Sequence, residues 1–180
     1  MVTFAEAAQG GPWRFPAWVR AEVTQQAALG LAMVGEPMSR VERTMDEARE
    51  LLTKVGPDGK RHELAGVHFT ADTLLLRQAA CYTEAGKPAR AATLFAGVIA
   101  SGSLSRRDAG FFRARRATAL ALSGEPDEAA TVGLQAVQVA KETNSERTLR
   151  LLMDVVGTLT PWSSRPGPRA LKQALSTSRR

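Results

Sequence analysis

The chain of 180 residues contains one cysteine, Cys81, so it cannot form an internal disulfide and nothing in it indicates an oxidising compartment. Aromatic residues make up only 6% of it, and the alternating Val, Ile and Tyr typical of strands are scarce. No apolar run approaches the roughly 18 residues of a membrane-spanning helix. The opening residues, MVTFAEAAQGGPW, lack the basic and apolar segments of a signal peptide. These absences predict a soluble, cytoplasmic protein.

Alanine and leucine supply much of the 44% hydrophobic content, and both favour helices over strands. Helices are expected near residues 16–34, 38–54, 66–85, 88–101, 106–123, 126–143, 145–159 and 167–177. The expected layout has three parts: an N-terminal extension over 1–15, a helical repeat domain over 16–159, and a linker, capping helix and frayed tail over 160–180. The predicted fold class is all-α.

Three Gly-x-Pro segments, GEP at 35–37, GKP at 86–88 and GEP at 124–126, each separate two stretches with apolar residues at helical spacing. Glycine accepts the left-handed conformation that ends a helix, and proline suits the first turn of the next one. Each segment is therefore predicted to be the elbow of a helical hairpin. About three such hairpins, followed by C-terminal capping helices, predict an α-solenoid, because no hairpin buries its apolar face alone.

The residues around the elbows resemble those of the tetratricopeptide repeat, a hairpin unit of about 34 residues. The middle hairpin matches best, through Ala79, Tyr82, Gly86, Ala91 and Phe95. In the third hairpin Gly133 replaces the expected large residue, and in the first the second helix is displaced by one residue, at Val41. The elbow glycines are 51 and 38 residues apart, and part of the excess is an exposed loop expected over 55–63.

The last third, AVQVAKETNSERTLRLLMDVVGTLTPW and then PGPRALKQAL, resembles the end of a known sensor region. This is the tetratricopeptide-like region of actinobacterial helix-turn-helix transcriptional regulators of the xenobiotic-response-element type. The opening GGPWRFPAWVRAE resembles a hairpin start from the same regions. The resemblance implies a right-handed solenoid that senses a ligand or dimerises. The residues before Phe15 are too few for the family's DNA-binding domain, so the expectation is a fragment or a stand-alone relative without that domain.

By the same resemblance, the first helix of each hairpin lines a concave groove for a peptide, a protein segment or a small effector. The implied groove residues are Gln25, Leu29, Met33, Leu76, Ala80, Thr83, Phe111, Ala114, Thr118 and Leu122. The implied basic rim, which would meet a carboxylate, consists of Arg113, Arg115 and Arg116. The alternative is that Leu76 and Phe111 pack against a neighbouring helix or a dimer partner.

No catalytic or cofactor motif is present, so we expect a protein that is not an enzyme and holds no cofactor. His62 and His68 lie six residues apart, a spacing that does not place them on one helix face, and no metal site is predicted. Cys81 is expected to be a small buried hydrophobe. The leading hypothesis is a binding module, with a homodimer as one form. The alternatives are a nucleic-acid-binding protein that uses the basic segment 106–116, in a chain of net charge +6, and a structural oligomerisation scaffold.

Overall fold

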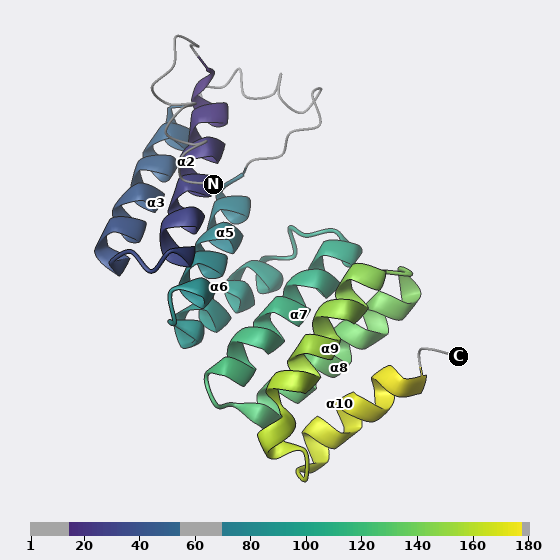
Figure 1. The fold of residues 1–180 in the computed structure, drawn as a ribbon. Coiled ribbons are helices and arrows are strands. Elements are labelled where there is room, and N and C mark those ends of the chain that lie inside the picture. Colours follow the sequence, from purple (N-terminus) through teal and green to yellow (C-terminus); the bar gives the residue numbers. More distant parts are fainter. Residues whose placement is uncertain (1–14, 55–69, 178–180) are drawn as a thin grey trace. The chain divides into compact units, whose positions relative to one another are not determined.

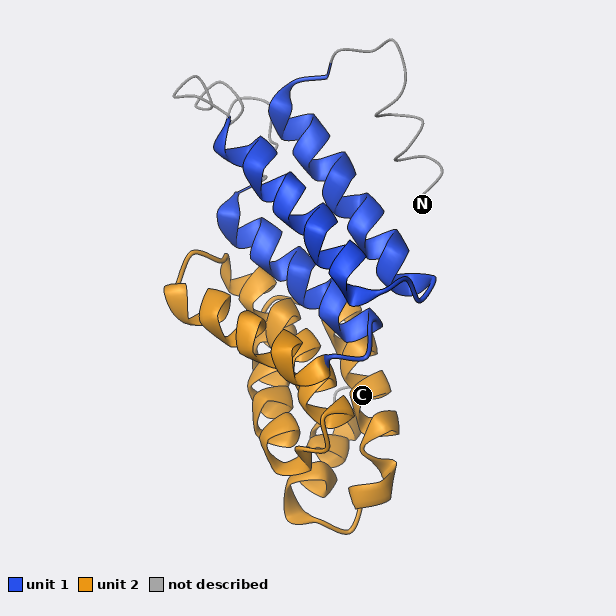
Figure 2. Ribbon diagram, turned by 90° about the vertical axis from the view of Figure 1, so that its left-hand side faces the viewer, with its two compact units in different colours: residues 1–87 blue, residues 88–180 orange. Residues whose placement is uncertain are grey.

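The computed structural model describes residues 15–54 and 70–177 (Figure 1). Every regular element within these two ranges is a helix, which confirms the all-α expectation for them. The chain divides into two compact units, residues 1–87 and 88–180, which are coloured separately in Figure 2. The division falls inside the repeat region that the sequence predicts over 16–159. Along the described parts of the chain, no helix is both long enough and apolar enough to cross a membrane.

The first unit holds the helices α2 (Ala17–Met33), α3 (Met38–Thr53) and α5 (Ala71–Glu84). Helix α2 packs against α3 and α5, and α3 also contacts α5. Their shared core consists of small and medium-sized side chains, namely Ala28, Leu31, Ala32, Val41, Met45, Ala48, Leu74 and Cys81. The alanines of α2 carry little side-chain bulk, so the neighbouring helices can lie close to it.

Helix α5 begins at Ala71, because Thr70 caps it there. The Thr70 hydroxyl accepts a hydrogen bond from the backbone N–H of Thr73 at 3.2 Å, and Asp72 places a negative charge in the first turn. The earlier start predicted at residue 66, and the loop predicted over 55–63, lie outside the described residues.

The second unit holds α6 (Pro88–Ser101), α7 (Arg106–Leu122), α8 (Pro126–Glu142), α9 (Glu146–Thr158), a 3-10 helix (Thr160–Trp162) and α10 (Pro166–Ser176). Helix α7 is central and packs against α6, α8 and α9, while α10 covers α8 and α9. The linker expected between residue 159 and the capping helix at 167–177 ends one residue earlier than predicted. It contains a 3-10 turn, and α10 begins at Pro166, where the missing N–H of proline costs no intrahelical bond.

The glycine at 133, where the repeat pattern expects a large residue, has a packing reason. A Cβ atom placed on Gly133 of α8 would come within 2.9 Å of the Leu171 side chain of α10. Leu171 is fully buried in this position. The capping helix thus supplies, from 38 residues further along the chain, the bulk that the repeat itself lacks.

The helix stops predicted at Gly35, Gly86 and Gly124 are confirmed. All three glycines are left-handed, with φ of 78°, 70° and 79°. Each glycine N–H bonds the carbonyl three residues earlier at 3.2 Å, and the next N–H bonds the carbonyl five residues earlier at 2.8–3.0 Å. This pair of bonds defines the Schellman motif and satisfies carbonyls that the helix end leaves open. Helices α2 and α3 pack against each other, as do α7 and α8.

A fourth elbow of the same kind joins α8 to α9 at Asn144. This residue has a φ of 48°, its N–H bonds the Lys141 carbonyl at 3.3 Å, and the Ser145 N–H bonds the Ala140 carbonyl at 2.8 Å. Asparagine is the residue that most often replaces glycine in this conformation. No Gly-x-Pro segment marks this elbow, but the helices expected over 126–143 and 145–159 predicted a helix break at residue 144.

The one-residue displacement predicted for the first hairpin is also confirmed. Pro37 precedes α3 as its cap, whereas Pro88 and Pro126 are the first residues of α6 and α8. The first buried residue of the second helix, Val41, consequently lies six positions after its elbow glycine, while Ala91 lies five after its own. The same buried face forms with the helix starting one residue later.

Candidate functional site

The groove residues predicted on α2 differ widely in exposure. Gln25 is fully buried, Leu29 is half-buried against the core of the first unit, and Met33 is 59% exposed. Val34, which follows the helix, is exposed as well. Only the elbow end of the predicted α2 surface is therefore open to a ligand.

On α5 the predicted groove residues are mostly covered. Leu76 and Ala80 are buried, and Thr83 is half-buried with its hydroxyl donating to the Ala79 carbonyl at 3.0 Å. The residue two positions before the elbow glycine, which is apolar in α2, is here Glu84 and is exposed. Helix α5 thus offers a charged rather than an apolar elbow end.

Helix α7 repeats the gradient seen on α2. Ala114 is fully buried, Phe111 and Thr118 are half-buried, and Leu122 at the elbow end is 51% exposed. The Thr118 hydroxyl donates a hydrogen bond to the Ala114 carbonyl at 3.1 Å. We call Met33 and Val34 the elbow patch of the first unit, and Leu122 the elbow patch of the second unit.

Phe111 is covered on one side by a neighbouring helix. The guanidinium carbon of Arg147 on α9 lies 3.9 Å from its ring centroid, and Phe112 meets the ring edge to face at a centroid distance of 5.3 Å. Phe111 therefore packs against a neighbour, as one of the two interpretations of the sequence expected.

The amide group of Gln25 is buried without a hydrogen-bond partner. Neither its Oε1 nor its Nε2 makes a hydrogen bond to the rest of the described structure, and the residue has no exposed surface. Burying an amide without a partner costs about 1–3 kcal/mol by mutational measures. In this conformation Gln25 cannot contact a ligand, although the sequence placed it in the groove.

The three arginines of the predicted basic rim do not lie on one face of α7. Successive helical residues are rotated by about 100°, so Arg115 falls on the stripe of Phe111 and Leu122, whereas Arg113 and Arg116 point towards α8. Arg116 forms an ion pair with Glu128 of α8. Of these three arginines, Arg115 alone lies on the side of α7 on which the groove was predicted.

Arg113 instead lines a polar cleft between α7 and α8. The cleft has a volume of about 510 Å³, and its walls are Arg106, Ala109, Arg113, Gln135, Gln138 and Val139. A smaller cleft of about 250 Å³ lies between α9 and α10 and is mainly apolar. Its walls are Met153, Val156, Lys172, Leu175 and Ser176.

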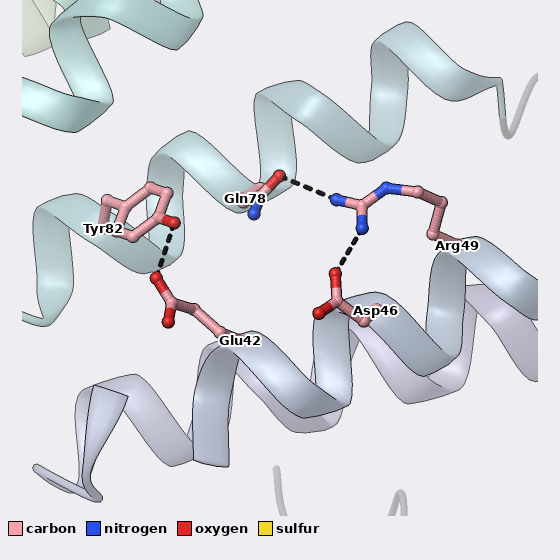
Figure 3. Close-up of polar contacts among 5 residues, drawn as sticks. All are labelled: Glu42, Asp46, Arg49, Gln78 and Tyr82. Carbon is pink, nitrogen blue, oxygen red and sulfur yellow. Dashed lines mark hydrogen bonds and ion pairs between the residues drawn. The ribbon is translucent and has the colours of Figure 1, made fainter. Parts of the chain in front are cut away.

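In the first unit, polar side chains tie α3 to α5 (Figure 3). The Tyr82 hydroxyl donates to the Glu42 carboxylate at 2.8 Å, and Arg49 bonds the Gln78 amide oxygen at 3.2 Å while it pairs with Asp46 on its own helix. Tyr82 is itself buried, so its hydroxyl needs such a partner. These contacts fix the packing of α3 against α5.

Burial raises the pKa of the Cys81 thiol to about 12, with a smaller contribution from the negative charge of Glu84. The thiol is thus protonated at neutral pH, and thiolate chemistry is disfavoured. Within residues 15–54 and 70–177, no three His, Cys, Asp or Glu side chains gather as a metal site would require. His62 and His68 lie outside the described residues.

Comparison with known proteins adds no assignment: no family model, no curated protein and no solved structure matches the chain. The candidate surfaces are therefore the two elbow patches and the polar cleft between α7 and α8, as the geometry of the described residues defines them.

Proposed function

We propose that the chain is a non-catalytic binding module whose tetratricopeptide-like hairpins form a right-handed α-solenoid. Support comes from a repeated helix ending, since the same Schellman motif ends α2, α5 and α7. Repeated hairpins of this kind stack, because a single hairpin leaves its apolar face uncovered. The sequence of the last third adds a role as the sensor or dimerisation region of a transcriptional regulator, or as a stand-alone relative of one.

The observation that carries the binding role is the equivalence of the two elbow patches. Met33 and Leu122 both stand two residues before an elbow glycine, and both residues are more than half exposed. An apolar side chain gains about 25 cal/mol for each Å² that a partner removes from water. The ligand proposed is a peptide segment of a partner protein with apolar side chains and a carboxylate, the latter facing Arg115. A small effector of the same chemistry is the alternative.

The proposed mechanism acts at the elbows. Each patch lies at the end of a helix, directly before the turn that sets its angle to the next helix. A ligand that binds one tilt of the hairpin better than another shifts the population towards that tilt. In a regulator this shift would change the geometry of a dimer or of a tethered domain.

The test uses an array of peptides that carry apolar and acidic residues, probed with the full-length chain. Peptides that bind are then measured by fluorescence anisotropy against the variants Met33→Glu and Leu122→Glu. Because each variant places a charge in an apolar contact, we expect each to weaken binding roughly tenfold or more, by about 1.4 kcal/mol or above. Met153→Glu is the matched control, since Met153 is an exposed methionine on α9 that belongs to neither patch.

Three outcomes decide the matter. Weaker binding in Met33→Glu and Leu122→Glu, with Met153→Glu unchanged, supports the proposal. Equal losses in all three variants would mean non-specific adhesion to apolar surface. Self-association seen by analytical ultracentrifugation, lost in the two patch variants and accompanied by no peptide binding, would instead identify an oligomerisation scaffold.

A further inference from the structure

The cleft between α7 and α8 contains one guanidinium group that is not neutralised by a partner. Arg106 at its edge pairs with Glu142, and the Gln138 amide donates to the same carboxylate at 3.3 Å. Arg113 is half-buried and makes no ion pair or hydrogen bond with any other described residue. The cleft therefore carries an unbalanced positive charge at Arg113.

Part of the lining of this cleft is apolar. Ala109 of α7 and Val139 of α8 line it, and a Cβ atom placed on Gly110 would come within 2.6 Å of the Val139 side chain. The two helices thus approach closely at Gly110, less than one turn before Arg113, whose side chain is half-buried. A charge-assisted hydrogen bond formed there is stronger than one formed in open solvent.

The other polar walls can pair with a peptide backbone. Gln135 and Gln138 each present an amide, which holds both donors and an acceptor, as does the main chain of an extended peptide. A volume of about 510 Å³ exceeds what a single carboxylate fills, and the planar guanidinium fork fits a carboxylate in bidentate fashion.

From these features we propose that the cleft is a second binding site, which takes an acidic peptide segment. One carboxylate of the segment pairs with Arg113, and its backbone amides bond Gln135 and Gln138. The site lies on the α8 side of α7, away from the stripe that carries Leu122. It shares no residue with the elbow patches, so either site can fail without the other.

The probe is a fluorescein-labelled hexapeptide of alternating Glu and Gly, with a Gln–Gly hexapeptide as the uncharged counterpart. Anisotropy titrations of the full chain should show binding of the first and little of the second. Arg113→Gln should weaken binding about tenfold, because one charge-assisted bidentate contact is lost. Gln135→Leu should weaken it several-fold with no change in charge.

Arg107→Gln is the matched control, since it removes the same charge from the same helix at an exposed residue that does not line the cleft. The affinity of this variant for the Glu–Gly peptide should stay within about twofold of that of the parent chain. Equal losses in Arg113→Gln and Arg107→Gln would show general electrostatic attraction and overturn the proposal, as would a parent chain that does not bind the Glu–Gly peptide. As a positive test, Arg113→Glu should lose the acidic peptide and gain affinity for a Lys–Gly hexapeptide. Met33→Glu and Leu122→Glu should leave this binding unchanged.

Discussion

The guanidinium carbon of Arg147 on α9 lies 3.9 Å from the ring centroid of Phe111 on α7. The Phe111 ring packs edge to face against the Phe112 ring at a centroid distance of 5.3 Å, and the Phe112 ring stacks on that of Phe95 of α6 at a centroid distance of 6.1 Å. The four side chains form a row that runs from a fully buried ring to an exposed cation. This row links α6, α7 and α9 within the second unit.

Replacing Arg147 with alanine should lower the free energy of unfolding by about 0.5–1 kcal/mol, the usual value of an exposed cation–π contact. Urea denaturation followed by circular dichroism measures the change. Arg150→Ala is the control, because Arg150 is an exposed arginine on the same helix and should alter stability by less than about 0.5 kcal/mol. Equal losses in both variants would mean that the ring contact contributes nothing specific.

Replacing Gln25 with methionine should raise the free energy of unfolding by about 1–2 kcal/mol. The substitution keeps the length of the side chain and removes an amide that is buried without a partner. The neighbouring Gln26 is only half-buried, so Gln26→Met should change stability by less than about 0.5 kcal/mol. A destabilised Gln25→Met chain would show that the amide has a partner essential to the fold.

The elbows could be predicted from sequence because their cause is local. A Gly-x-Pro segment specifies a left-handed helix end and the start of the next helix, whatever the rest of the chain does. Asn144 forms the same stop with no proline after it, so a pattern defined by Gly-x-Pro could not find it. The division of the chain between Lys87 and Pro88 falls within one of the predicted elbows, but nothing in its Gly-x-Pro segment distinguishes it from the other two.

The candidate site was less predictable, because burial and facing depend on which helices pack together. Gln25 and Met33 share the predicted groove pattern, yet one is fully buried and the other is 59% exposed. Arg113 and Arg115 are close in sequence but point to different sides of α7. The surroundings of each arginine depend on α8, which packs against one side of α7.

The geometry of the elbows predicts opposite effects for two glycine substitutions. Gly124→Ala should lower the free energy of unfolding by about 1–2 kcal/mol, because alanine is strained at a φ of 79° even where space is open. Gly97→Ala, in the middle of α6 and also with open space around it, should raise it by about 0.5–1 kcal/mol. Thermal unfolding of both variants measures the contrast. If Gly124→Ala proved as stabilising as Gly97→Ala, φ at the elbow would not limit the fold.

Alkaline pH should weaken the fold through Cys81. Burial raises the pKa of this thiol to about 12 from an ordinary value of 9.0, so between these pH values the folded chain keeps a proton that the unfolded chain releases. Stability from this group is complete below about pH 9 and is lost towards pH 12, by at most about 1.4 kcal/mol per pH unit. Urea denaturation of the parent chain and of Cys81→Ala, at pH 7 to 11, isolates the effect from that of other titrating groups. The difference in unfolding free energy between the two chains should narrow above pH 9. A constant difference over that interval would show that the thiol ionises as easily in the folded chain as in the unfolded one.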